Sequence, residues 1–185
     1  DLSKSEREEL SKHKIPATRI RVPHKTYAFE DKVYGQTSQN LSKLCGDFIV
    51  QRADEVFAYQ LAVVVDDADM GVTEVVRGSD LLSSTPRQLY LQDVLGFSHP
   101  IYAHLPLLVA PDGRRLSKRN HDLDLGVLRD QGKTPEEILG FLAYCIGLAE
   151  KEEPLSAVQV ANRFSWNVLR AHRKNVVVEH FSHVL

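Results

Sequence analysis

The chain has 185 residues, of which 43% are hydrophobic and 26% are charged, and its 23 lysines and arginines nearly balance 25 aspartates and glutamates. The apolar fraction is sufficient for one sizeable core. The formal net charge of −2 argues against intrinsic disorder and against a polybasic nucleic-acid binder. No apolar run approaches the about 18 residues that cross a bilayer, and the charged amino-terminal stretch does not resemble a signal peptide.

The cysteines give no sign of a metal centre or of a disulfide. Cys45 and Cys145 are the only two, and neither belongs to a CxxC motif or to a Cys/His spacing typical of zinc ligands. This usage predicts two reduced, half-buried thiols in a cytoplasmic protein. The lack of a membrane-spanning run predicts no membrane partner.

A short helix and several strands are predicted at the beginning of the chain. Residues 1–14 are predicted to form an exposed helix with a capping box between Ser5 and Glu8, ending before Pro16. The stretch ATRIRVP alternates between β-branched and charged side chains, which is typical of a half-buried strand. Strands are predicted over residues 17–23, 25–31 and 47–52. The polar stretch 35–40 is expected to be a connection between strands.

The middle of the chain alternates between helix and strand patterns. The stretch AYQLAVVVDDADMG, residues 58–71, fits a helix or a buried strand, and its Ala, Gln and Leu favour a helix. Buried strands are predicted over residues 72–78 and 101–109. A turn at residues 111–113 and a basic loop at residues 114–122 follow.

The clearest helix covers residues 84–96. Thr85 is predicted as its N-cap, with Pro86 at the first helical position, Gln88 completing a capping box and Gly96 ending the helix. Its predicted inner face comprises Leu91, Val94 and Leu95.

The last third of the chain is predicted to be helical. A helix over residues 134–148 begins at Thr134, with Glu137 completing a capping box. Its apolar face is predicted to comprise Ile138, Leu142, Cys145, Ile146 and Ala149. Residues 155–164 are predicted as the last helix, and the pattern at the carboxyl end leaves its structure open. The rhythm of helices and strands predicts an α/β fold with some parallel strand pairing.

Several polar groups are candidates for chemistry. Four cations, at positions 114, 115, 118 and 119, lie within the loop RRLSKR and suit a polyphosphate, although a solvated basic turn carries the same signature. Asp66, Asp67 and Asp69 form a carboxylate cluster that can hold Mg²⁺, cap helices or face water.

Two further candidates come from the predicted strands. Arg77 stands at the carboxyl end of one, where α/β sheets bind ligands, and its planar fork suits a carboxylate. An ordinary ion pair between Arg77 and Asp80 is the alternative. His104 lies in an apolar run and is expected to be a hydrogen-bonded core residue, and Trp166 is expected to serve packing.

The ordered series of Tyr59, VVVDD, VVRG, STPRQ, HLPL and LSKR resembles the catalytic domain of glutamyl-tRNA synthetases, and the resemblance runs from about residue 17 to about residue 178. The stretch RLSKR at residues 115–119 is similar to the KMSKS-type signature of class I aminoacyl-tRNA synthetases. YQLAVVVDD, the Asn-His pair after LSKR and the ending FSW are more similar to the shortened glutamyl-queuosine tRNA(Asp) synthetases.

The resemblance implies a fold and its parts. It implies the second half of a Rossmann-type catalytic domain, preceded by a small β-rich insert and followed by a helical region. The expected parts are a remainder of the inserted acceptor-type domain, the half Rossmann domain with the LSKR loop, and the helical region, over residues 1–55, 56–130 and 131–185.

The resemblance also implies the substrate sites. Tyr59 and Arg77 would lie in the glutamate pocket, with Arg77 pairing with a carboxylate of the substrate. His104 and Leu105 would lie beside the adenine of ATP, mostly through their backbone.

Phosphate binding is implied for the loop RLSKR. Lys118 would be the catalytic residue that contacts the phosphates of ATP and stabilises the transition state as the adenylate forms. Arg115 and Ser117 would support this grip, and ATP would enter as its magnesium complex.

The implied activity is ATP-dependent activation of L-glutamate and its transfer to tRNA. Queuosine in the anticodon of tRNA(Asp) is the favoured acceptor. The alternatives are a glutamyl-tRNA synthetase that charges tRNA(Glu), a fragment that only binds tRNA or nucleotide, and a fragment without function.

Parts of the family pattern are absent from this sequence. The HIGH-like His pair, the amino-terminal Arg and acidic residue of the glutamate site, and the zinc-binding Cys/Tyr cluster would all precede Asp1. We therefore expect the chain to be the carboxyl-terminal half of such an enzyme, with zinc ligands only in the other half. A half-site cannot hold ATP from both sides, so the isolated chain is expected to be inactive or impaired.

Overall fold

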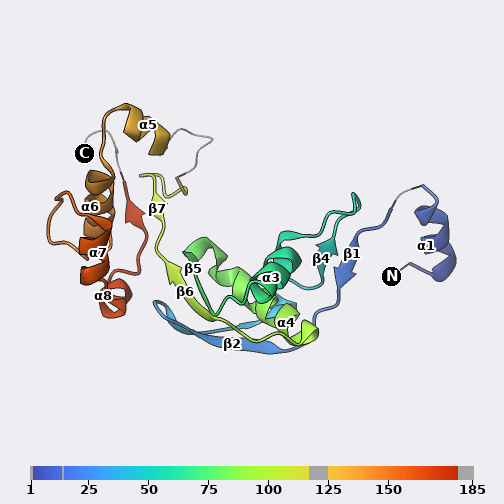
Figure 1. Ribbon diagram of the computed structural model, residues 1–185. Coiled ribbons are helices and arrows are strands. Elements are labelled where there is room, and N and C mark those ends of the chain that lie inside the picture. Colours follow the sequence, from blue (N-terminus) through green and yellow to red (C-terminus); the bar gives the residue numbers. More distant parts are fainter. Residues whose placement is uncertain (1, 14, 117–124, 179–185) are drawn as a thin grey trace. The chain divides into compact units, whose positions relative to one another are not determined.

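The computed structural model describes residues 2–13, 15–116 and 125–178, which Figure 1 draws in colour. The chain divides into two compact units. Within those ranges, unit 1 comprises residues 1–30, 36–75 and 83–101. Unit 2 comprises residues 31–35, 76–82 and 102–185. The division into three parts at residues 55 and 130 stays a prediction.

The first helix, α1 (Lys4–Ser11), confirms the predicted helix but not its cap. Ser3 is the N-cap, and its side chain accepts a hydrogen bond from the backbone N–H of Glu6 while the Glu6 carboxylate accepts one from the Ser3 backbone N–H. The capping box predicted for Ser5 and Glu8 is therefore wrong by two residues. Both serines are followed by a glutamate three positions on, so the motif alone did not distinguish them.

The strands predicted for the beginning of the chain are present. They are β1 (Thr18–Ile20), β2 (Thr26–Asp31) and β4 (Phe48–Gln51). The stretch expected to be a connection is instead a strand, β3 (Gly35–Asn40), and α2 (Leu41–Leu44) follows it. β3 is a neighbour of β2 in the sheet, and this backbone pairing outweighs the low strand propensity of its polar residues.

Two sheets contain most of these strands. β1 pairs with β4 in antiparallel orientation, with Ile20 opposite Phe48. The larger sheet has the strand order β3-β2-β6-β5, where β5 is Glu74–Gly78 and β6 is Ile101–Leu105. β2 and β6 are paired in parallel, with Asp31 opposite Tyr102. This parallel pairing confirms the α/β fold class.

Two helices of unit 1 pack against each other. They are α3 (Tyr59–Asp69), which settles the ambiguous stretch as a helix, and α4 (Thr85–Leu95). Buried apolar side chains in this unit are Tyr27, Leu41, Val64, Leu89 and Leu91.

The start and the inner face of α4 differ from the prediction. A 3-10 turn, η1 (Ser79–Ser84), leads directly into the helix, so Thr85 is already helical and no side chain caps the end. Gln88 does not form the predicted capping box; its amide donates to Gln60 on α3 at 2.9 Å. Leu91 is buried as predicted, but Val94 and Leu95 are exposed. Gly96 ends the helix in the left-handed conformation, as predicted.

The last third of the chain is helical, as predicted, with two short strands. The helices are α5 (Leu125–Asp130), α6 (Pro135–Cys145), α7 (Ala157–Arg163) and α8 (Trp166–Ala171). Thr134 and Glu137 form the predicted capping box. α7 was expected to be the last helix, but α8 follows it, and β8 (Val176–Val177) then pairs in parallel with β7 (Leu108–Val109).

Two apolar clusters hold this region together. Leu128, Phe141 and Val178 form one, and Ala143, Leu148, Ala149 and Leu155 form the other. Trp166 packs edge-on against the ring of Phe164, with centroids 4.8 Å apart, which confirms its packing role. Among the described residues, no helix combines the length and apolar character needed to span a membrane.

Candidate active site

Three strand ends bring a carboxylate, an imidazole and a guanidinium together in unit 2. Asp31 is the last residue of β2, His104 lies near the end of β6, and Arg77 lies near the end of β5. The Nδ1 atom of His104 lies 2.6 Å from Oδ2 of Asp31. The Nε atom of Arg77 donates to Nε2 of His104 at 3.0 Å. The three side chains therefore form one connected chain of hydrogen bonds.

The contact with Arg77 determines where the proton of His104 resides. The Nε atom of an arginine always carries hydrogen, so Nε2 of His104 must accept and is unprotonated. The ring hydrogen therefore sits on Nδ1 and is donated to Asp31. In this arrangement His104 is neutral, Asp31 carries the negative charge and Arg77 carries the positive charge.

Asp31 is held in its ionised form by its surroundings. Burial favours the neutral acid, but hydrogen bonds from the His104 ring and from the backbone N–H groups of Tyr34, Val33 and His104 lower the pKa of this carboxyl below its ordinary value. The side chains of Asp31 and His104 are both fully buried. A fixed negative charge thus lies directly behind the imidazole.

Arg77 is further oriented by its neighbours in unit 2. Its guanidinium carbon lies 5.2 Å from the ring centroid of Tyr102, within the range of a cation–π contact. Its Nη2 atom points to the backbone oxygen of Leu81 at 3.5 Å. A half-buried, oriented guanidinium of this kind suits a carboxylate ligand.

The beginning of the basic segment RLSKR contacts the loop that follows β5. The backbone of Arg115 bridges to Val109 of β7, and the N–H of Leu116 donates to the oxygen of Leu108 at 3.3 Å. These bonds close a hairpin over the predicted turn at residues 111–113. The side chain of Arg115 pairs with Asp80, three positions after Arg77.

Gly78 makes room for this ion pair. A Cβ atom at Gly78 would lie 2.6 Å from Oδ1 of Asp80 and 3.0 Å from a methyl carbon of Leu107. The absence of a side chain therefore lets the Asp80 carboxylate fold back beside the strand end. Asp80 was considered as a partner for Arg77, but the structure pairs Asp80 with Arg115 and Arg77 with His104.

The other predicted residues have different outcomes. Ser117 and Lys118 lie outside the described residues, and so does the expected approach of Lys118 to Arg77. Leu105 ends β6 and is half-buried. Tyr59 is the first residue of α3 in unit 1, where it is 54% exposed.

The carboxylate cluster lies in the last part of α3. Asp66 and Asp69 are exposed and Asp67 is half-buried. Within the described part of the chain, no group of three or more acidic, histidine or cysteine side chains is arranged to hold a metal ion.

Asp31 was not among the predicted site residues. Its signal was available, because it ends a predicted strand just as Arg77 does, and the ends of parallel strands share one edge of a sheet. The expectation that His104 is a hydrogen-bonded core residue is confirmed, with Asp31 as the partner that the sequence did not identify.

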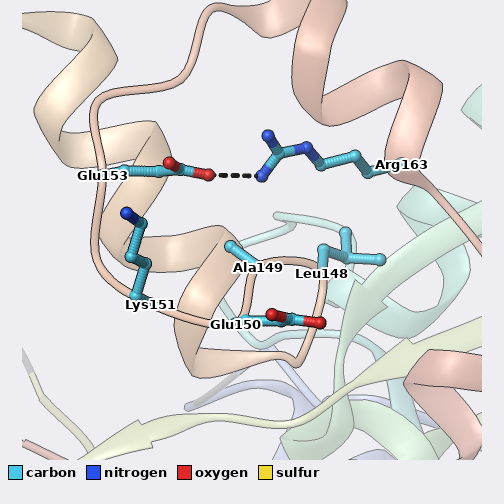
Figure 2. Close-up of a pocket in the computed structure, with 6 residues that line it drawn as sticks. All are labelled: Leu148, Ala149, Glu150, Lys151, Glu153 and Arg163. Carbon is cyan, nitrogen blue, oxygen red and sulfur yellow. Dashed lines mark hydrogen bonds and ion pairs between the residues drawn. The ribbon is translucent and has the colours of Figure 1, made fainter.

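A surface pocket lies elsewhere in unit 2 and contains none of these residues. Its volume is about 510 Å³, and Figure 2 shows the ion pair between Glu153 and Arg163, 2.9 Å long, at its side. Its lining residues are Leu148, Ala149, Glu150, Lys151, Glu153 and Arg163. Two of these side chains are acidic and two are basic.

The family model of the catalytic domain of class I tRNA synthetases for E and Q matches residues 1–182. The chain belongs to this family. The resemblance of the ordered motifs is thereby confirmed, and the strand ends that carry Arg77 and His104 are part of a class I synthetase catalytic domain.

Curated relatives and solved structures agree with this membership. The glutamyl-Q tRNA(Asp) synthetase of Geobacter sulfurreducens is 57% identical over 112 residues, which cover 60% of this chain and 36% of that protein. The protein of the same name from Pseudomonas putida strain GB-1 is 59% identical over 102 residues, 55% of this chain and 35% of that protein.

The solved structures cover more of the chain. A glutamate tRNA ligase from Elizabethkingia meningosepticum, in complex with its amino acid, matches 95% of this chain and 39% of its own, with a TM-score of 0.75 and 25% identity. The glutamate-tRNA synthetase of Elizabethkingia anophelis matches with a TM-score of 0.76 and 26% identity, over 96% of this chain and 40% of its own. The chain spans little more than a third of the length of the two curated relatives.

Proposed function

We propose that the protein carrying this chain activates L-glutamate with ATP and transfers it to tRNA, with queuosine in the anticodon of tRNA(Asp) as the acceptor. The observation that carries the proposal is the oriented guanidinium of Arg77, placed at a strand end of a class I synthetase domain. The ion pair between Asp80 and Arg115 supports it, because it ties the beginning of the RLSKR segment to the loop after Arg77.

Each substrate has assigned residues in this proposal. Arg77 binds a carboxylate of glutamate, and Tyr59 offers its hydroxyl and ring. Because the side chain of His104 is engaged with Asp31 and Arg77, His104 and Leu105 contact adenine through their backbone.

The basic segment RLSKR binds the phosphates of ATP. Lys118 contacts them and stabilises the charge that develops as the adenylate forms, with Ser117 and Arg115 in support. Magnesium enters with ATP. We place the reaction in the cytoplasm.

The choice of acceptor rests on the names of the relatives that are 57–59% identical. Charging of tRNA(Glu) is the second candidate, favoured by the likeness to the two Elizabethkingia glutamate-tRNA ligases. These relatives and structures each share only part of their length with this chain.

Pyrophosphate exchange tests the activation step. In the complete protein, exchange should require L-glutamate, and Lys118→Ala should reduce its rate about a hundredfold or more. Exchange that proceeds equally with another amino acid, or that is unaffected by Lys118→Ala, would contradict the proposal.

Acceptor assays test the transfer step. We expect labelled glutamate to be esterified to tRNA(Asp) that carries queuosine, and neither to tRNA(Asp) without queuosine nor to tRNA(Glu). Charging of tRNA(Glu) alone would favour the second candidate. Binding of tRNA that weakens steeply with salt, without any exchange, would indicate a protein that only binds nucleic acid.

A further inference from the structure

We infer that Asp31 and His104 are positioning residues of the glutamate site, which fix the guanidinium of Arg77 so that its terminal Nη edge faces the substrate carboxylate. This inference rests on the proposed role of Arg77. It concerns two buried residues that touch neither glutamate nor the reacting atoms through their side chains.

The geometry gives each residue a distinct part. Asp31 accepts the Nδ1–H of His104 at 2.6 Å, which fixes the tautomer and leaves Nε2 as an acceptor. Nε2 then accepts the Nε–H of Arg77 at 3.0 Å. Without the carboxylate, the Nδ1–H would lose its acceptor, and the tautomer with hydrogen on Nε2, which cannot accept from Arg77, would be less strongly disfavoured.

The contact also determines which edge of the guanidinium meets a ligand. An arginine binds a carboxylate through its Nε/Nη side or through its two Nη atoms. Since Nε already donates to His104, a carboxylate must approach the Nη edge. The ring of Tyr102, 5.2 Å from the guanidinium carbon, covers one face and restricts rotation about the side chain.

The carboxylate of Asp31 is built to remain charged and immobile. It accepts hydrogen bonds from the backbone N–H groups of Val33 and Tyr34 at 2.9 Å and of His104 at 3.1 Å. It also accepts one from the imidazole. Both partners are fully buried. Reorganisation of the pair during binding is therefore small, which is what a positioning device requires.

Two replacements of His104 separate its two hydrogen bonds. His104→Gln places an amide near the position of Nε2 and can still accept from Arg77, whereas His104→Asn places its amide near Nδ1 and can only serve Asp31. We expect His104→Asn to raise the KM for glutamate about tenfold or more, and His104→Gln to raise it less than about threefold. Because the proposed adenine contact of His104 uses its backbone, the KM for ATP should change less than the KM for glutamate in His104→Asn.

A matched control exists in unit 1. Asp93 and His99 form another Asp–His pair, whose atoms lie 2.8 Å apart and whose side chains are exposed. Asp93→Asn should leave the KM for glutamate unchanged, and Asp31→Asn should raise it about tenfold. Pyrophosphate exchange in the complete protein provides the KM for glutamate of all four variants.

Nitrogen NMR tests the hydrogen bonds that link Asp31, His104 and Arg77 without a catalytic assay. We expect the His104 ring to show a protonated Nδ1 and an unprotonated Nε2, and the Arg77 Nε–H to be slow to exchange in the wild type and in His104→Gln but not in His104→Asn.

The outcomes separate the two proposals. Glutamate-dependent exchange with equal KM increases in the Asn and Gln variants, or a protonated Nε2, would overturn the positioning role and leave the proposed function intact. Absence of any glutamate dependence in the wild type would overturn the proposed function and this inference with it.

Discussion

Asp80 forms an ion pair with Arg115, which joins the loop after β5 to the hairpin that begins the RLSKR segment. The two side chains are 31% and 61% exposed, so the pair contributes little to stability. Its consequence is geometric, because Asp80 follows Arg77 by three positions and the basic segment begins at Arg115. The carboxylate-binding and phosphate-binding parts of the proposed site are therefore tied together by one contact.

Replacement of Arg115 should weaken ATP binding. We expect Arg115→Gln to raise the KM for ATP about fivefold or more in pyrophosphate exchange, because it removes both a cation and the link to Asp80. Arg114 is the matched control, since its Nε donates to Asp112 within the turn at 3.1 Å. Arg114→Gln should leave the KM within about twofold, and equal effects of the two variants would contradict the assignment.

The acid sensitivity of the protein should depend on Asp31. Its pKa is lower in the folded state than in the unfolded chain, so its ionisation stabilises the fold above about pH 4 and this contribution is lost as pH falls through the folded pKa. Urea denaturation from pH 7 to pH 3 measures the effect. The difference in unfolding free energy between wild type and Asp31→Asn should be largest near neutrality and shrink in acid. A difference that is independent of pH would show that the carboxylate charge is not responsible.

The capping sequences show how far local patterns carry. Thr134, Pro135 and Glu137 start α6 as predicted, because the box directly precedes the helix and nothing competes with it. At α4 the same pattern of Thr, Pro and Gln gave the wrong cap, because η1 continues into the helix and Gln88 bonds to Gln60 instead. A tertiary contact overrode a local signal there.

The candidate site shows the same limit of prediction from local sequence patterns. Arg77 and His104 could be selected from the sequence, and the order of motifs identified their family. The bond between them could not be predicted, because it depends on the neighbouring positions of β5 and β6 in the sheet. Asp31 ends a predicted strand as Arg77 does, but its bond to His104, 73 positions away, depends on the pairing of β2 with β6.

Gly140 should tolerate no side chain. A Cβ atom there would overlap the backbone oxygen of Glu153 and lie 3.3 Å from the backbone nitrogen of Leu155, and backbone atoms cannot turn aside. The segment is itself fixed, because the N–H of Leu155 donates to the oxygen of Glu136 at 2.9 Å. We expect Gly140→Ala to lower the unfolding free energy by about 3 kcal/mol in urea denaturation.

Gly71 provides the comparison for that variant. It adopts a φ of +67° with open space around the position of a Cβ atom, so Gly71→Ala introduces backbone strain alone. A loss of about 1 kcal/mol is expected. Equal losses for the two variants would show that α6 can move away from residues 153–155.

Cys145 should react slowly with thiol reagents although it is not fully buried. Burial, followed by the negative charge of Glu152, raises the pKa of its thiol to about 11. Since only the thiolate attacks, alkylation by iodoacetamide at pH 8 should be at least about tenfold slower in the folded chain than in urea. A Cys45→Ser variant isolates this thiol. Folded-state alkylation as fast as that in urea would mean that the thiol at the end of α6 is neither desolvated nor opposed by a neighbouring carboxylate.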